Sequence, residues 1–179
     1  MTQEAAAARL ADGEKHLETG AWEAAETEFR RAIEADASSA LAYSKLGVAL
    51  VHQRRLDEAG QAFSRAVAID PKYAPAWSNL GNIYRESGRT EQALDAYQRA
   101  IAADPDYWIA HQNLGGLYRQ MGRMSEAIAS LRKATRLSAQ AALRPTGTGQ
   151  GRRLGCLGGA ALWLVVLAAA ALIFRTHGV

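Results

Sequence analysis

The sequence is poor in the residues that build catalytic and metal sites. It has one cysteine, Cys156, in 179 residues, so no intrachain disulfide can form and the fold must depend on its apolar core. The four histidines are not spaced as metal ligands, and neither HExxH nor CxxC occurs. The phosphate-binding GxxxxGK motif and the nucleophile motif GxSxG are absent as well. These absences predict a protein that is not an enzyme and that uses no cofactor or metal.

Acidic residues are missing from the C-terminal part of the chain. All eighteen lie at or before Glu126, whereas seventeen of the 21 basic residues precede Arg144, so residues 1–143 have a formal charge of about −1. The basic residues without acidic neighbours are Arg144, Arg152, Arg153 and Arg175. A nucleic-acid-binding protein normally carries a clustered basic face. No such cluster is evident before residue 144, and we expect no nucleic-acid partner.

A period of 34 residues organises the first 140 residues. Each set of equivalent positions keeps one kind of residue: an aromatic or histidine, a leucine, a glycine, a second large apolar residue, or alanine. The sets are Tyr43, Trp77 and His111; Leu46, Leu80 and Leu114; Gly13, Gly47, Gly81 and Gly115; Phe29, Phe63, Tyr97 and Leu131; Ala25, Ala59, Ala93 and Ala127; and Ala32, Ala66, Ala100 and Ala134. The chain therefore repeats one supersecondary unit.

Each unit is expected to form two helices. The first apolar stripe of the third unit has the spacing i, i+3, i+4 and i+7 and comprises Trp77, Leu80, Gly81 and Tyr84. Gly88 interrupts the pattern and suits the left-handed residue that follows a helix end. A second stripe ends at Asp104-Pro105, because the residue before a proline disfavours the helical conformation. Gly81 is expected to let the two helices approach closely.

These positions resemble the signature of the tetratricopeptide repeat (TPR) family: an aromatic, Leu-Gly, Tyr, and then a small, an aromatic, a small residue and Pro. The segment AWSNLGNIYRESGRTEQALDAYQRAIAADPDY is nearly a consensus repeat. The resemblance covers residues 5–140 and implies an all-α superhelical array, an α-solenoid, with units near 6–39, 40–73, 74–107 and 108–141. The second unit departs from the pattern at Arg54, where the other units have glycine. The first has Arg9 and Asp12 at apolar positions, as an N-terminal capping unit would.

In the TPR family, the first helix of each repeat lines a concave groove that receives a peptide or a partner helix. Transferred by position, the resemblance nominates groove residues in the second, third and fourth units: Lys45; Asn79, Asn82 and Arg85; Asn113 and Arg119. Further groove positions are Ser44, Val48, His52, Ser78, Glu86, Gln112, Gly116 and Gln120. An asparagine amide both donates and accepts, so it can pair with a peptide backbone, and arginine can pair with a carboxylate. The alternative is that these are ordinary solvated helix positions.

One TPR subtype is disfavoured. Co-chaperone TPR domains hold a terminal carboxylate with basic groove residues, and Ser44, Ser78 and Ile109 occupy positions where basic residues would be required. We therefore do not expect binding of a chaperone tail.

The C-terminal part predicts a membrane anchor. Residues 157–174 contain no charge, and as a helix they span roughly 27 Å, enough to cross a hydrocarbon core. We predict a single transmembrane helix over residues 155–175 and a flexible basic linker over residues 144–154. Three arginines precede the apolar run and Arg175 follows it, which favours a cytosolic array and a tail-anchored mode of insertion. Whether Cys156 carries an acyl chain stays open.

The resulting hypothesis is a membrane-tethered adaptor or scaffold that binds a partner protein or peptide in the groove. The excess of arginine over lysine and the abundant alanine favour a bacterial inner membrane over a eukaryotic organelle. Two alternatives stay open. One is a structural protein that assembles with copies of itself, and the other is an accessory subunit of a membrane complex or secretion machine.

Overall fold

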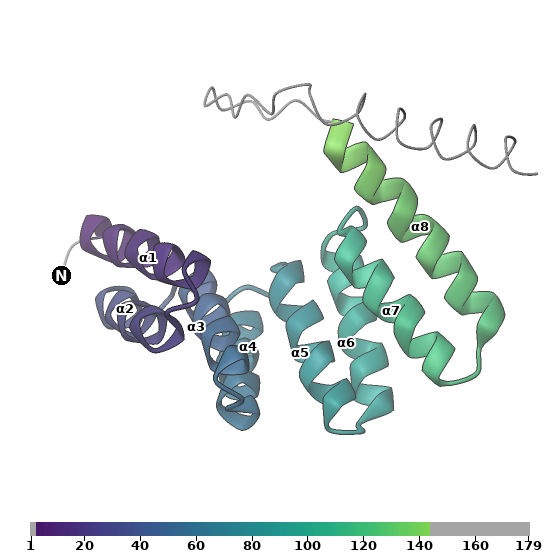
Figure 1. Ribbon diagram of the computed structural model, residues 1–179, viewed down its shortest axis with the longest axis horizontal. Helices are drawn as coiled ribbons and strands as arrows, with labels where there is room; N and C mark the ends of the chain where they lie inside the picture. The colour runs from purple at the N-terminus through teal and green to yellow at the C-terminus, as the bar shows by residue number, and fades with distance from the viewer. Residues whose placement is uncertain (1–2, 144–179) are drawn as a thin grey trace, which may run out of the picture. The chain divides into compact units, whose positions relative to one another are not determined.

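The array is built from pairs of helices. The computed structural model of the protein describes residues 3–143. They form eight α-helices: α1 (Gln3–Glu18), α2 (Trp22–Ala35), α3 (Ala40–His52), α4 (Leu56–Ile69), α5 (Ala74–Glu86), α6 (Thr90–Ala103), α7 (Trp108–Gln120) and α8 (Met124–Leu143) (Figure 1). Each odd-numbered helix packs against the even-numbered helix that follows, and each even-numbered helix packs against the next odd-numbered one. The predicted all-α repeat array is confirmed for these residues.

The turn inside each helix pair contains one residue in the left-handed region. Gly20, Gly88 and Gly122 have φ values of 75°, 73° and 74°. The prediction for Gly88 is confirmed. In the second unit the same role falls to Arg54, with φ of 63°. A side chain at this conformation strains the backbone, because its Cβ approaches the following carbonyl oxygen.

An aspartate ends the second helix of the first three units. Asp36, Asp70 and Asp104 each accept a 2.9 Å hydrogen bond at Oδ1 from the backbone N–H two residues further on. This Asx turn diverts the backbone from the helical path. It forms at Asp36 without a following proline, so the aspartate itself is sufficient. Position 138 of the last unit is a serine, and α8 continues to Leu143.

A glycine and an aromatic ring fix each of the first three helix pairs. A Cβ added to Gly13, Gly47 or Gly81 would lie 2.5, 2.6 or 2.5 Å from a ring carbon of the residue sixteen positions further on. Those residues are Phe29, Phe63 and Tyr97, which are fully buried. The close approach predicted at Gly81 is therefore confirmed, and its partner is the Tyr97 ring.

The membrane prediction concerns a different part of the chain. Within residues 3–143, no helix combines the length and apolar character required to cross a membrane. The predicted linker (144–154) and the predicted transmembrane helix (155–175) lie outside the described residues.

Candidate functional site

The nominated groove residues lie on α3, α5 and α7, and α3 and α5 enclose a cavity of about 220 Å³. Its walls combine apolar, amide and charged side chains: Val48, Val51, His52, Phe63, Asn79, Asn82, Ile83 and Glu86. Two of the nominated asparagines thus meet at one cavity, opposite two valines. We call the exposed side of α3, α5 and α7 around this cavity the groove surface.

Asn82 is oriented by a buried tyrosine. The Tyr97 hydroxyl donates a 2.7 Å hydrogen bond to Asn82 Oδ1. Burial, the main cause, raises the pKa of Tyr97 to about 12, so the hydroxyl keeps its proton at neutral pH. With the amide oxygen engaged, the Asn82 NH₂ group is the part of the amide left to donate to a ligand.

Asn79 and Asn113 are equivalent in the repeat but differ in their contacts. The Asn113 amide donates a 3.1 Å hydrogen bond to Ser78 Oγ, which joins α7 to α5. Asn79 has no side-chain hydrogen bond among the described residues, although Ser44 stands in the equivalent place. Asn79 therefore keeps both its donor and its acceptor for a ligand. In Asn113, by contrast, one N–H of the amide is already used in the hydrogen bond to Ser78.

Two of the wider set of groove positions are not at the surface. Ser44 and Ser78 are 3% and 1% exposed, so their placement in the groove is wrong. Each lies one residue before a half-buried neighbour, Lys45 or Asn79. Consecutive residues of a helix point about 100° apart, so a shift of one residue moves a side chain from the core to the surface.

The three nominated cations have different environments. Lys45 Nζ lies 2.6 Å from Glu14 Oε1, an ion pair between α3 and α1. Arg85 is half-buried and extends toward α7, where its Nη1 lies 3.6 Å from the position of a Cβ built on Gly116. Arg119 is exposed. In the described part of the chain neither arginine has an ion pair, so both can meet a ligand carboxylate.

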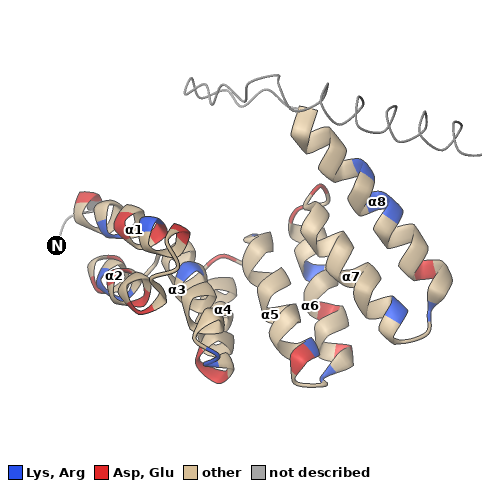
Figure 2. Ribbon diagram, in the orientation of Figure 1, with Lys and Arg blue, Asp and Glu red and all other residues tan. Residues whose placement is uncertain are grey.

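Charged residues are few on α5 and α7 and gather at their C-terminal ends (Figure 2). Arg85 and Glu86 close α5, and Arg119 is the penultimate residue of α7. The middle of each helix instead presents amides. The groove surface is therefore suited to a backbone or apolar segment in its centre and to charged groups at one end.

Sequence reasoning missed two residues beside the groove surface. The ring of Trp22 stacks on His52, with centroids 3.9 Å apart and planes 5° from parallel. Glu14 neutralises Lys45 from α1. Neither position belongs to the TPR signature. Both contacts join separate helices, and such contacts cannot be predicted from local sequence patterns.

Known repeat sequences match most of the array. Residues 38–106 and residues 78–142 match two sequence profiles of the family described as tetratricopeptide repeat. The chain belongs to the tetratricopeptide repeat family. A comparison with curated protein sequences gave no match.

Solved TPR structures share the fold. PilF of Pseudomonas aeruginosa is 29% identical, with a TM-score of 0.70 over 76% of this chain and 62% of that one. MamA is 28% identical, with a TM-score of 0.67 over 76% of this chain and 80% of that one. TTC0263, a thermophilic TPR protein of Thermus thermophilus, is 26% identical, with a TM-score of 0.69 over 75% of each chain.

A more distant TPR structure contains a peptide. The first TPR domain of Spaghetti (RPAP3), bound to the HSP90 peptide SRMEEVD, is 19% identical, with a TM-score of 0.64 over 68% of this chain and 97% of that one. At this identity the likeness concerns the fold alone.

Proposed function

We propose that this TPR protein is an adaptor whose groove surface binds an extended segment of a partner protein. The observation that carries the proposal is the Tyr97–Asn82 hydrogen bond, which orients an amide donor in the lining of a partly apolar cavity. Asn79 adds a second amide without a partner in the described residues. These amides would pair with peptide carbonyl and N–H groups, while Val48 and Val51 receive an apolar side chain.

The charged end of the groove surface adds a second element of recognition. Arg85 and Arg119 have no carboxylate partner within residues 3–143, and Glu86 follows Arg85 at the end of α5. A carboxylate on the bound segment would form charge-assisted hydrogen bonds with these guanidinium groups. The proposed ligand therefore combines an apolar side chain for the cavity with an acidic residue.

Proximity labelling of the intact protein in its own cells tests this proposal. The variant Asn79→Ala, Arg119→Ala removes two side chains without hydrogen bonds or ion pairs in the described residues, so the fold should persist. A matched control, Gln98→Ala, Arg132→Ala, changes an amide and an arginine that are exposed on α6 and α8. We expect the first variant alone to lose labelled partners. An unchanged partner set in both variants would mean that the groove surface is not the binding site.

Membrane tethering is the second part of the proposal. The support is the uncharged run of residues 157–174 and the arginines that precede it, which favour a cytosolic array and, with the arginine-rich composition, a bacterial inner membrane. Carbonate extraction of membranes tests it. We expect the full chain to stay in the membrane pellet and a chain ending at Arg144 to be released. Release of the full chain would contradict tethering.

A second candidate function is self-assembly through the last helix. Met124, Ile128 and Leu143 of α8 are large apolar side chains that are 57%, 49% and 83% exposed. In a repeat array this face would normally receive a further unit. Light scattering of the purified protein and of Ile128→Lys tests this candidate, because self-assembly predicts a smaller particle for the variant.

A further inference from the structure

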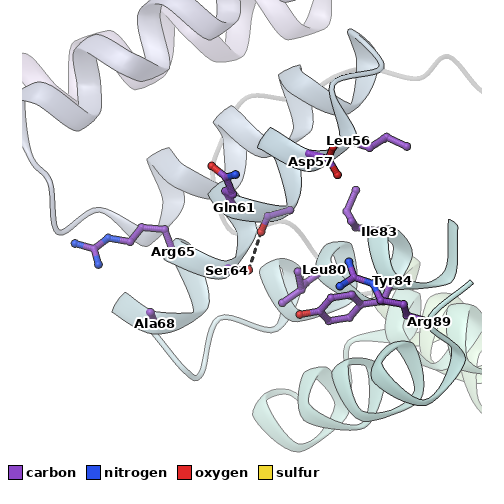
Figure 3. A pocket seen from close by; sticks show the side chains of 11 residues that line it. Leu56, Asp57, Gln61, Ser64, Arg65, Ala68, Leu80, Ile83, Tyr84 and Arg89 are labelled. Carbon is purple, nitrogen blue, oxygen red and sulfur yellow. Dashed lines mark hydrogen bonds between the residues drawn. The ribbon is translucent and has the colours of Figure 1, made fainter. Parts of the chain in front are cut away.

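A second and larger cavity borders an adjoining face of α5. It has a volume of about 490 Å³ and lies between α4, α5 and Arg89, the residue that precedes α6 (Figure 3). Leu80, Ile83 and Tyr84 of α5 line it together with Gly60 and Ser64 of α4 (Figure 3). Ile83 alone lines both this cavity and the one on the groove surface. We call the larger cavity the α4–α6 cleft.

A glycine at a position where other units have a side chain accounts for the space. The equivalents of Gly60 are Glu26, Leu94 and Ile128. Glu26 Oε2 lies 2.7 Å from Arg55 Nη1, and Leu94 packs against the core around Tyr97. A Cβ at Gly60 would lie 3.4 Å from Ile83 Cγ2, an ordinary contact distance. The cleft can therefore accept a side chain at the place where neighbouring units supply their own.

An arginine beside the cleft also lacks the partner that its equivalents have. Arg55, Arg89 and Arg123 each precede the second helix of a unit. Arg123 lies over the Tyr118 ring, 4.5 Å from its centroid, while Nε and Nη2 donate to the carboxylate of Glu126. Arg55 donates in the same way to Glu58, through Nε at 2.7 Å and Nη2 at 2.6 Å. In both units, a glutamate three residues on binds the edge of the guanidinium group.

Arg89 has the stacking contact but not the carboxylate. It lies over the Tyr84 ring, 4.6 Å from its centroid. The residue three positions on is Gln92, and Arg89 forms no ion pair within residues 3–143. Stacking occupies one face of the guanidinium plane and leaves its edge, with two parallel N–H donors, open to a carboxylate.

We propose that the α4–α6 cleft binds a partner-protein segment in which an acidic residue adjoins a leucine or isoleucine. The carboxylate occupies the edge of Arg89, as Glu126 does at Arg123. The apolar side chain fills the space beside Gly60, as Leu94 does in the next unit. Charge favours this occupant at Arg89, which lines the cleft and has no carboxylate partner within residues 3–143. The lining includes one acid, Asp57, and the Arg65 side chain extends away from α5 (Figure 3). The site is separate from the groove surface and does not depend on the function proposed there.

Methyl NMR of the full-length protein in detergent micelles tests the proposal, with labelled leucine and isoleucine methyl groups. The probe is the peptide acetyl-Glu-Leu-Leu-amide, and its matched control is acetyl-Gln-Leu-Leu-amide. We expect saturable shifts at Leu56, Leu80 and Ile83, with the glutamine peptide binding at least about tenfold more weakly, since a hydrogen bond to a charged group is lost. Equal binding of the two peptides, or no saturable shift, would overturn the proposal.

Substitutions taken from the other units give a second test. Gly60→Leu introduces the leucine that the next unit has at the equivalent position 94. Its side chain should fill the cleft and abolish binding of the glutamate peptide. Arg89→Gln should weaken the glutamate peptide to the level of the glutamine peptide and leave the latter unchanged. If Gly60→Leu does not fold, the smaller change Gly60→Ala replaces it in the test. Gly60→Ala should weaken binding of the glutamate peptide at least threefold. Normal binding by the Gly60 and Arg89 variants contradicts the proposal.

Two further measurements distinguish the cleft from the groove surface and from self-association. Asn79→Ala, on the groove surface, should leave peptide binding in the cleft unchanged, and a loss of binding would assign the effect to the groove instead. Shifts at Leu56, Leu80 and Ile83 that appear on raising the protein concentration without peptide would assign the cleft to a second copy of this chain. That result would contradict a separate partner.

Discussion

Tyr97 and Asn82 form a hydrogen bond of 2.7 Å that joins the two helices of the third unit. The equivalents of Tyr97 are Phe29, Phe63 and Leu131, and those of Asn82 are Glu14, Val48 and Gly116. A hydroxyl and an amide thus occur together in this unit alone among the described repeats. The pair places a polar contact beneath the groove surface where the neighbouring unit has Phe63 and Val48.

Tyr97→Phe should lower the free energy of unfolding by about 1 kcal/mol, because the variant loses one intramolecular hydrogen bond while its ring keeps its place against Gly81. Urea denaturation followed by circular dichroism measures the change. Adding Asn82→Val recreates the Phe–Val pair of the second unit and should recover most of the loss. A double variant no more stable than Tyr97→Phe would count against the pairing.

Gly81→Ala should destabilise the array by about 1–3 kcal/mol, the usual cost of overpacking, because the new methyl group would lie 2.5 Å from the Tyr97 ring. Gly60→Ala is the matched control, since its methyl group meets Ile83 at 3.4 Å and alanine favours the helix. We expect the control to be neutral or stabilising in urea denaturation. Similar effects at the two glycines would contradict the close packing of Gly81 on Tyr97.

Arg54→Gly should stabilise the array by about 0.5–1 kcal/mol. The left-handed conformation at φ 63° costs an arginine more than a glycine, and the gain is partly offset by the greater freedom of glycine in the unfolded chain. The reverse change, Gly88→Arg, should destabilise by a similar amount, since nothing lies within 4 Å of a Cβ at Gly88 and only the backbone is affected. Thermal melting of both variants gives the comparison.

His111 should make the stability depend on pH. The ring is 5% exposed, and its Nε2 lies 3.0 Å from the carbonyl oxygen of Pro105, as Trp77 Nε1 lies 2.9 Å from that of Pro71. Burial is the main reason that the pKa of His111 is lowered. Below the ordinary histidine pKa of about 6.5, the unfolded chain binds a proton that the folded one does not, so stability falls as the pH drops. Above it, the effect vanishes.

His111→Trp introduces the tryptophan that the third unit has at the equivalent position 77. The variant has no imidazole to titrate at position 111. Urea midpoints at pH 7.5 and pH 5.5 should therefore differ less in the variant than in the natural protein. The acidic groups with lowered pKa values, such as Glu26 and Glu58, titrate below their ordinary value of 4.5 and contribute little in this window. An identical pH dependence in both proteins would exclude His111 as its source.

The repeat period is sufficient to predict the helix pairs and the left-handed turn at Gly88, because both depend on residues close in sequence. It does not predict which equivalent residues make contact. Asn79 and Ser44 have the same types and spacing as Asn113 and Ser78, yet only the second pair is joined by a hydrogen bond. Such contacts depend on how closely separate helices approach, which local sequence does not determine.

The α4–α6 cleft is a feature that comparison between units could have suggested. Gly60 stands where the other units have Glu26, Leu94 and Ile128, and Gln92 stands where the second and fourth units have Glu58 and Glu126. Gly60 and Gln92 are 32 positions apart in sequence and lie on different helices. Only the structure shows that Gly60 lines the same space as Arg89, the arginine that Gln92 leaves without a carboxylate partner. Departures from a repeat are thus as informative as the repeat itself once the packing is known.

Site-specific photocrosslinking in cells tests whether a partner segment binds at the groove surface. A benzophenone amino acid at Val48 lies in the wall of the groove cavity, and the same amino acid at Gln98 lies exposed on α6. Illumination should give a discrete protein adduct from position 48 and none from position 98. Adducts of equal yield at both positions, or an adduct from position 98 alone, would contradict binding at the groove surface.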